Sequence, residues 1–351
     1  MSESSRKPKL ILWTIAVLIL IALLWWAHEK VAFDWHTLGV QLRAVSWKYA
    51  VAAIACIYIS FVFRAVRWRI LLGEQGKGHT AELIAPQFIG FSGVALIGRL
   101  ADLARPYLIA RKLKLPVAGQ LAVYSMERAF DLAAAAIIFS ITLAFAPKDM
   151  PHHETFAKAG IVSFAATAAI AIFAIALRTA GGAVASIVRK LISPLSKDVA
   201  AKIAERILDF RDGLRTISSA SSLLGALAIS LVTWACIAGS YVFTAHAFVA
   251  EPTLATMSFT ATMLIMATSM GGSLVQLPIL GWFTQIALIA AAFHTFFSVP
   301  LEAATACSAL LLIDNFLCVI PAGLIAAQLS GTSLREAARV TEASEAAALT
   351  E

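Results

Sequence analysis

Residues 97–111 read IGRLADLARPYLIAR, a charged stretch that lies between two apolar segments. Arg99, Asp102 and Arg105 are spaced three residues apart, so on a helix they lie near one side and each neighbouring pair can form an ion pair. Pro106 is expected to break or kink that helix. The spacing predicts two guanidiniums held close together by a carboxylate, which a phosphate group can displace or join. The alternative is a solvated connector at the cytoplasmic surface of a membrane.

The chain around this stretch is strongly apolar. Of its 351 residues, 60% are hydrophobic and 14% are charged, and its mean hydropathy is +0.82. Soluble domains carry about 25% charged residues. The composition therefore predicts an integral membrane protein and leaves no room for a separate soluble catalytic domain. The net charge of +7 is typical of cytoplasmic loops that meet anionic lipids, so we expect the membrane as a partner and no nucleic acid.

Long apolar segments recur along the whole chain and are candidate transmembrane helices. We predict an all-α polytopic membrane protein with eight spans, near residues 10–27, 49–66, 118–146, 156–177, 221–249, 253–270, 274–297 and 302–328. The first segment ends in a pair of tryptophans and lacks a small-residue cleavage site, so we interpret it as a retained span. The loops rich in Lys and Arg predict a multi-pass protein of the bacterial inner membrane with both termini cytoplasmic.

The predicted spans form one main domain. We expect a cytoplasmic N-terminus at 1–9, a transmembrane domain at 10–328 and a cytoplasmic tail at 329–351. Within the domain, residues 183–217 place charges of both signs opposite apolar residues at helical spacing. That pattern predicts an amphipathic connector along the cytoplasmic surface.

Glycine interrupts a short apolar segment at 81–98. This segment contains Pro86 and the glycines Gly90 and Gly93, and basic residues flank it on both sides. Because both flanks are expected to be cytoplasmic, we predict a re-entrant hairpin broken at the two glycines. Irregular backbone at membrane depth is tolerated only where protein buries it or water lines it, so the segment is a candidate cavity wall.

A second interrupted segment lies at 269–285 and contains Gly271, Gly272 and Gly281. Broken segments in both halves of a chain indicate a midplane site in a transporter built from an inverted repeat, which we state as a hypothesis. Two ordinary kinks at helix ends are the alternative. The sequence leaves open whether 253–297 forms two spans or one span and a re-entrant segment.

Two arginines end the second predicted span. Arg64 and Arg67 share a helix face because they are three residues apart. A planar guanidinium binds phosphate oxygens in pairs, so one interpretation places both in a cavity that takes a phosphate. The other interpretation is snorkelling toward the cytoplasm under the positive-inside rule.

Charged residues also begin the third predicted span. Glu127, Arg128 and Asp131 are expected at or just inside its cytoplasmic boundary. An intramembrane ionisable residue is a functional hypothesis by default, and we expect Asp131 to pair with Arg128 and with Arg99 or Arg105. A purely structural ion pair is the alternative.

Asp314 is predicted near the bilayer centre, where a carboxylate costs about 2.5–3.5 kcal/mol. Gln285, in the preceding span, is expected at a similar depth. A hydrogen bond between the two side chains is one explanation, and proton coupling through Asp314 is the other.

Several chemistries find no support in the sequence. The four cysteines lie in apolar runs without metal-ligand spacing. The sequence has no P-loop, no H-E-x-x-H zinc motif and no G-x-S-x-G nucleophile motif. We therefore expect no cofactor and no metal, and a transporter in place of an enzyme.

Four ordered motifs resemble the flippase-like membrane domain of lysylphosphatidylglycerol synthases. They are RAVRWRILL at 64–72, GRLADLARPYLIARKLKLP at 98–116, MERAFDL at 126–132 and LPILGWFTQIAL at 277–288. The resemblance covers residues 10–328 and implies a stand-alone relative without the synthase domain, which moves a phospholipid or lipid-linked headgroup between leaflets.

The resemblance also assigns residues. It places the family's Arg–acid–Arg–Pro run on Arg99, Asp102, Arg105 and Pro106, and its Glu–Arg–x–x–Asp run on residues 127–131. Asp102 stands where the family usually has Glu. The late segment, with Gly281 and Gln285, departs from the family's Pro-Gly-Gly…Glu pattern, and this departure bears on the substrate.

Three functional hypotheses follow. In the first, an anionic phospholipid or lipid-linked headgroup enters a cavity walled by 81–98 and 269–285. The cavity residues would be Arg64, Arg67, Arg99, Asp102, Arg105 and Arg128, supported by Glu127, Asp131, Gln285 and Asp314. The second hypothesis is a non-transporting partner of an enzyme of lipid, polysaccharide or hopanoid synthesis. The third is a membrane enzyme that acts on a lipid-linked sugar.

Overall fold

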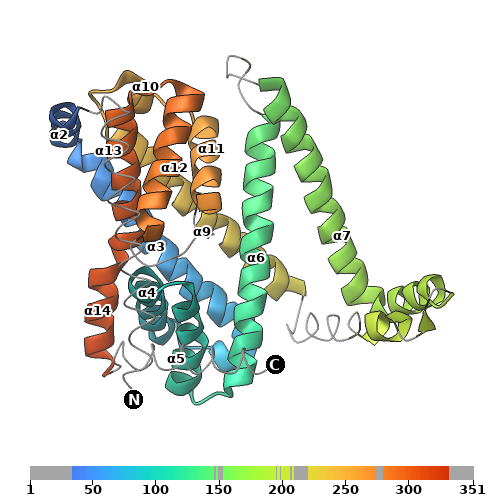
Figure 1. Cartoon of the computed structure of the whole chain (residues 1–351). Helices are drawn as coiled ribbons and strands as arrows, with labels where there is room; N and C mark the ends of the chain where they lie inside the picture. Colours follow the sequence, from blue (N-terminus) through green and yellow to red (C-terminus); the bar gives the residue numbers. More distant parts are fainter. Residues whose placement is uncertain are drawn as a thin grey trace, which may run out of the picture. The chain divides into compact units, whose positions relative to one another are not determined.

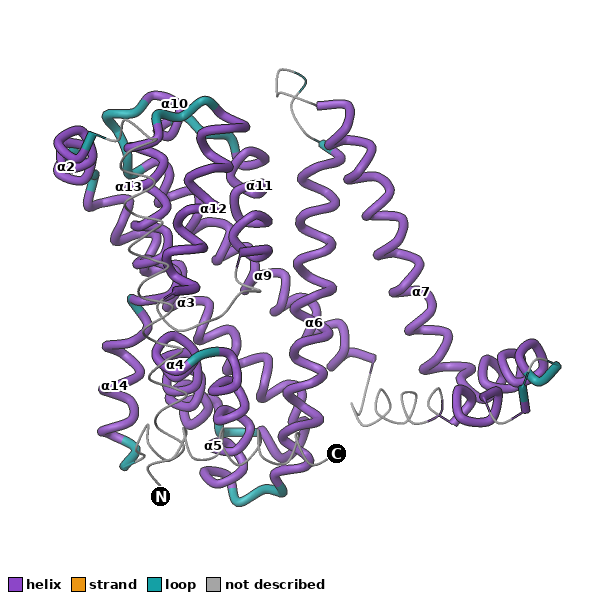
Figure 2. The backbone as a smooth tube through the Cα atoms, viewed as in Figure 1, coloured by secondary structure: helices purple, strands orange, loops and turns teal. Residues whose placement is uncertain are grey.

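The computed structural model describes residues 34–145, 148, 153–194, 196–197, 199–205, 208, 220–272 and 280–331. This described part is built of helices and loops without a strand, which confirms the predicted all-α class (Figure 2). The predicted first span and the tail beyond residue 331 lie outside it, so these stay predictions.

Helices account for most of the described chain (Figure 1). Four helical segments are long and apolar enough to cross a membrane: Trp47–Gly76, Thr80–Ile97, Ser221–His246 and Leu301–Leu329. Two shorter apolar helices are Phe259–Met270 and Gly281–Phe297. These segments fit a multi-pass membrane protein.

The chain divides into two compact units, each of which draws on separate parts of the sequence. Unit 1 comprises Met1–Ile54, Ala95–Arg99 and Ser240–Cys318. Unit 2 comprises Ala55–Val94, Leu100–Gly239 and Val319–Glu351. The helices α3 (Trp47–Leu72), α4 (Thr80–Ile97) and α9 (Ala220–His246) contribute residues to both units.

In unit 1, α13 (Leu301–Leu312) is the common packing partner of two other helices. The helix α2 (Trp35–Arg43) lies against it, and the N–H of Asp34 donates to Glu302 Oε1 at 3.2 Å. Asp34 also caps α2, since its side chain accepts from the N–H of His36 at 2.8 Å. The other helices are α10 (Pro252–Ala255), α11 (Phe259–Gly272) and α12 (Leu280–Phe297), of which α12 packs against both α11 and α13.

Unit 1 ends in an unusual helical turn. The predicted span 302–328 is helical, but η4 (Ile313–Leu317) is a π-helical turn that separates α13 from α14 (Val319–Leu329). The N–H of Cys318 donates to the carbonyl of Ile313, five residues earlier, at 2.8 Å. Such wide turns are rare in proteins, and those that do occur often lie at functional sites. Asp314 lies in this one.

In unit 2, α4 and α5 (Ala104–Leu113) form an antiparallel hairpin. Leu83 and Ile109 share one core cluster, while Gly90 lies against Arg105 and Gly93 against Ala101. The helix α4 continues through Gly90 and Gly93, so the predicted break at these glycines is wrong. The chain reverses after α4, where Gly98 has a φ of 115° that glycine adopts readily, and η3 (Arg99–Leu103) leads into α5.

A second hairpin in unit 2 joins α6 (Val117–Ala144) to α7 (His153–Ile192). Gly160 lies directly against the backbone of Leu143 and Ala144, which lets the two helices approach closely. The predicted span 156–177 is therefore part of a longer helix that departs from helical geometry at Ala180. The predicted connector 183–217 starts within α7, and most of 206–219 lies outside the described residues.

The predicted late segment 269–285 is described only at its two ends. Gly271 and Gly272 end α11, and Gly281 lies in the first turn of α12. Residues 273–279 lie outside the described part, so the division of 253–297 stays open. The first predicted span of this pair starts later than expected, because α11 begins at Phe259.

Close packing of α14 on α4 gives a first prediction. A methyl group at Gly323 would collide with the side chain of Ser92 and the carbonyl of Phe88, so we expect Gly323→Ala to lower the stability by about 1–3 kcal/mol. Thermal unfolding of the purified protein in detergent measures the loss. Gly119→Ala, where nothing lies within 4 Å, is the control and should not destabilise the protein. Equal melting temperatures for the two variants would contradict this account.

Candidate functional site

Unit 2 contains a buried cluster of charged side chains, called here the arginine cluster. It consists of four arginines and three carboxylates: Arg64, Arg67, Arg105, Arg128, Asp102, Glu127 and Asp131. The side chains of Arg67, Arg105 and Glu127 are fully buried. Segments predicted separately as site candidates thus meet in one place. The side chain of Arg99 lies outside the described part.

Glu127 lies at the centre of the arginine cluster. Its carboxylate accepts from Arg67 Nη2 at 2.5 Å and lies 3.0 Å from Arg105 Nη1. It also lies 3.3 Å from Arg128 Nη2 and 3.9 Å from Arg64 Nη1. One carboxylate therefore contacts all four guanidiniums.

Asp131 links α6 to α3 and α9. It accepts from Arg67 Nη1 at 2.6 Å and from the indole N–H of Trp234 at 3.3 Å, and it lies 3.1 Å from Arg128. The predicted pair between Arg128 and Asp131 is confirmed. Of the two further partners expected for Asp131, Arg105 instead pairs with Asp102 and Glu127. The contact with Arg99 stays a prediction, because that side chain lies outside the described part.

Asp102 forms the predicted ion pair with Arg105, at 2.6 Å from its Nε. A second bond of 3.2 Å from Arg105 Nη2 makes the pair bidentate, and the hydroxyl of Tyr124 donates to the same carboxylate at 2.8 Å. Arg128 Nη1 also lies 3.8 Å from Asp102 Oδ2, so two guanidiniums face this carboxylate. Pro106 lies in the first turn of α5, where its missing N–H needs no partner, and so it does not break this helix.

The side chain of Arg105 is held by residues that sequence reasoning missed. Gln87 accepts from its Nη1 at 2.7 Å, and its guanidinium lies 4.6 Å from the Phe91 ring centroid and 5.4 Å from that of Tyr124. Gln87, Gly90 and Phe91 share one face of α4, and Gly90 leaves the space that Arg105 fills. A single glutamine in an apolar segment, three residues before a glycine, was the available signal.

The arginine cluster carries more positive charge and more donors than its carboxylates use. Four guanidiniums face three carboxylates, which leaves a net charge of about +1 in a buried site. Within the described structure, buried N–H groups without a hydrogen-bond acceptor include Nε of Arg64, Arg67 and Arg128 and Nε2 of Gln87. Each of the three carboxylates lies within 4 Å of at least two guanidiniums.

The cluster lies well inside the helices that carry it. Arg105 precedes the end of α5 by eight residues, and Glu127 follows the start of α6 by ten. At 1.5 Å per residue, both lie about 12–15 Å from the turn between these helices. This distance is about half of the hydrocarbon core of a bilayer. Where the membrane boundary falls along α6 is not fixed by these distances, so the position of Glu127 at the cytoplasmic boundary of its span stays a prediction.

Comparison with known families identifies the type of membrane domain. A family model described as the lysylphosphatidylglycerol synthase TM region matches residues 13–343. The chain belongs to this family. The match confirms the resemblance seen in the motifs, and it makes this a multi-pass membrane protein with a lipid-related function. Among curated proteins and among solved structures, no chain matches this one.

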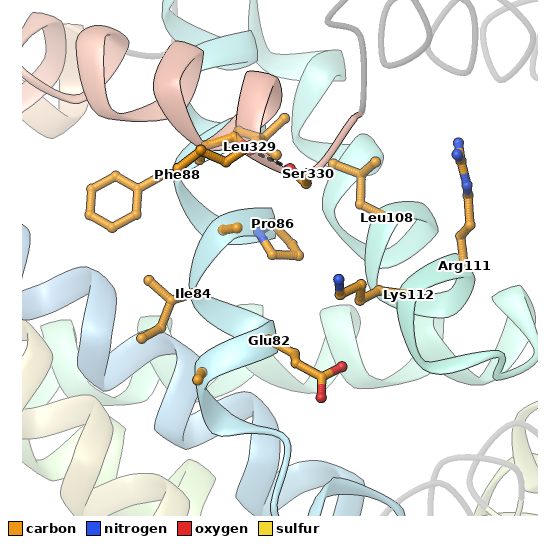
Figure 3. A pocket seen from close by; sticks show the side chains of 13 residues that line it. Glu82, Ile84, Pro86, Phe88, Leu108, Arg111, Lys112, Leu329 and Ser330 are labelled. Carbon is orange, nitrogen blue, oxygen red and sulfur yellow. Dashed lines mark hydrogen bonds between the residues drawn. The ribbon is translucent and has the colours of Figure 1, made fainter.

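A pocket of about 690 Å³ lies on another part of unit 2 (Figure 3). Residues of α4, α5 and α14 line it, including Glu82, Pro86, Lys112 and Leu329. The predicted cavity was walled by 81–98 and 269–285 and lined by arginines of the cluster. The observed pocket has α4 as one wall, as predicted, but α14 takes the place of 269–285 as the other. The arginines of the cluster are not among its lining residues.

The two remaining polar residues of the predicted site, Gln285 and Asp314, belong to unit 1. Gln285 Nε2 donates to the hydroxyl of Ser269 at 2.8 Å, and Tyr241 donates to the same hydroxyl at 2.7 Å. Asp314 instead lies 2.9 Å from the hydroxyl of Thr244. The hydrogen bond considered between Gln285 and Asp314 is therefore wrong.

Neutralising the central carboxylate tests the charge balance of the cluster. We expect Glu127→Gln to lower the stability by about 3–5 kcal/mol, because it leaves four guanidiniums, three of them buried, with two carboxylates. Thermal unfolding measures this, and added inorganic phosphate should raise the melting temperature of the variant more than that of the unmodified protein. The exposed Glu154, 3.9 Å from Lys158, is the control, and Glu154→Gln should have little effect. A variant that phosphate does not stabilise would argue against an anion-accepting cluster.

Gly90 gives a geometric test. A methyl group there would collide with Cγ and Cδ of Arg105, so Gly90→Ala should displace this arginine from Glu127 and Asp102 and destabilise the protein. In an Arg105→Ala background the methyl has room, and the same substitution should have a much smaller effect. A double-mutant cycle of melting temperatures measures this coupling. Additive effects would show that Gly90 does not act through Arg105.

Proposed function

We propose that this protein moves an anionic phospholipid or lipid-linked headgroup between membrane leaflets and that the arginine cluster binds the headgroup. The observation that carries the proposal is the surplus of one positive charge and several donors in a buried site. A phosphodiester has one negative charge and two free oxygens. It would neutralise the surplus and accept from guanidiniums by charge-assisted hydrogen bonds.

The same cluster offers a way to release the headgroup. Each guanidinium that turns toward a phosphate leaves a carboxylate, and Glu127 and Asp131 have other arginines within reach. The exchange of partners keeps every charge paired, which avoids the high cost of an isolated buried charge. Binding that is only slightly favourable lets a headgroup leave as well as enter.

Arg128 is the proposed point of first contact. Its side chain is 35% exposed, while those of Arg67 and Arg105 are fully buried. Lys112 lies in the last turn of α5 and Lys114 in the connection to α6, and by the positive-inside rule we assign this end of the two helices to the cytoplasm. On this basis we place both termini in the cytoplasm, the protein in the bacterial inner membrane and the cluster near the bilayer midplane.

The arrangement favours transport over catalysis. A general base needs a carboxylate that is free to take a proton, and all three carboxylates here are engaged by arginines. A role as a partner of a lipid-synthesis enzyme would not require a buried charge surplus. It remains the outcome if transport is absent and a synthase is recovered with the protein.

Headgroup movement in proteoliposomes tests the proposal. Vesicles would contain a headgroup-labelled phosphatidylglycerol, a phosphatidylethanolamine or a neutral glycolipid, and a membrane-impermeant quencher reports the outer fraction with time. We expect the protein to accelerate movement of the anionic lipid, and Arg128→Gln to slow it about tenfold or more, because a hydrogen bond to a charged group contributes about 1.5–3 kcal/mol. Arg128→Lys, which keeps the charge, should retain part of the rate.

Arg43 provides a matched control. It is exposed in the last turn of α2 and lies outside the arginine cluster, so Arg43→Gln should leave the rate unchanged. Equal rates for folded Arg128→Gln and Arg43→Gln would remove the cluster from the mechanism. No acceleration of any lipid by the unmodified protein would contradict translocation itself.

A further inference from the structure

Asp314 is a buried carboxyl group outside the arginine cluster. It is 1% exposed and lies in the π-helical turn η4. It follows Leu301 by thirteen residues in the apolar segment Leu301–Leu329, which places it about 20 Å from the start of that segment. This is the middle of a candidate membrane span, where an ionised carboxylate is most costly.

The surroundings of Asp314 differ from those of the carboxylates in unit 2. Asp131 contacts three guanidiniums and an indole N–H. Asp314 has the hydroxyl of Thr244 near Oδ2, and Oδ1 is buried without a hydrogen-bond partner in the described structure. The titratable groups beside it are the thiols of Cys307 and Cys318, which cannot compensate a negative charge. The packing supports a neutral acid far better than a carboxylate.

Hydrogen-bond counting leads to the same result. Thr244 Oγ1 lies 2.9 Å from the carbonyl of Ser240 and 2.9 Å from Asp314 Oδ2, but a hydroxyl has a single proton. Other helical threonines of this protein donate to the carbonyl four residues earlier, namely Thr233, Thr262 and Thr268. If Thr244 does the same, the proton in its contact with Asp314 must come from the carboxyl group.

We propose that Asp314 is a proton-binding site in the middle of its span, held as the neutral acid that donates to Thr244. The π-helical turn supports this arrangement. The thiol of Cys318 donates to the backbone carbonyl of Asp314 at 2.8 Å, while the N–H of Cys318 bonds to Ile313. Access of water to Oδ1 would release the proton, because hydration removes the desolvation free energy that disfavours the ionised carboxylate. The proposal does not rest on lipid movement.

Infrared spectroscopy of the protein in lipid tests the proton directly. At neutral pH we expect a carbonyl-stretching band of one protonated carboxylic acid, which shifts in D₂O and is lost in Asp314→Asn. Thr244→Val should move the band to higher frequency, because the acid loses its acceptor, while Thr244→Ser should leave it in place. No such band in the unmodified protein, or the same band in Asp314→Asn, would overturn the proposal.

The melting temperature of Asp314→Asn provides a second test, which does not depend on resolving the infrared band. An asparagine has the shape of the neutral acid and carries no charge. Asp314→Asn should therefore melt within a few degrees of the unmodified protein. A large loss of stability would show that the ionised form is the one the fold requires, and it would also overturn the proposal.

Discussion

The arrangement of unit 2 depends on one carboxylate that four guanidiniums surround. Glu127 is fully buried, and the arginines that contact it come from α3, α5 and its own helix α6. Buried ions need partners of opposite sign at short range, because desolvation otherwise outweighs their attraction. Charge thus helps to fix the relative position of the three helices, and a hydrogen bond from Trp68 of α3 to Gln120 of α6, at 3.0 Å, adds to it.

The two carboxyl environments of this protein illustrate two solutions to the same problem. In the arginine cluster, acids stay ionised because guanidiniums surround them. At Asp314, the one polar side-chain contact that the described residues make with the acid is a hydroxyl, and neutralisation by a proton is the remaining way to lower the cost of burial. A headgroup with a phosphate fits the first environment and is excluded by the second.

Local spacing predicted the parts of the cluster that lie close in sequence. The pairs Asp102–Arg105 and Arg128–Asp131 follow from helical geometry, and both are present. The pairing of α3 with α6 joins residues about sixty positions apart, and no periodicity in the chain encodes which arginine meets which acid. The family match shows the type of domain, but the contacts of Gln87 with Arg105 and of Thr244 with Asp314 come only from packing.

The predicted hairpin within 81–98 is wrong, because α4 is one continuous helix and α5 forms the return limb of the observed hairpin. The two structural uses of glycine explain the error. A glycine is required either where φ is positive or where another group approaches too closely for a side chain. The residue type in the sequence does not distinguish these two requirements. Gly98 serves the first purpose, while Gly90 and Gly93 serve the second inside a continuous helix. Residue type alone does not separate these roles, and for this reason the reversal was predicted at Gly90 and Gly93, although the chain reverses at Gly98.

The contact between Gly90 and Arg105 also limits how this protein can change over evolutionary time. The two positions share one volume, so a larger residue can be accepted at 90 only after the one at 105 has become smaller. Loss of the arginine would first have to be tolerated by its acidic neighbours. Substitutions at these sites are therefore ordered, and a lineage that has lost Arg105 is the one in which a side chain at position 90 should appear.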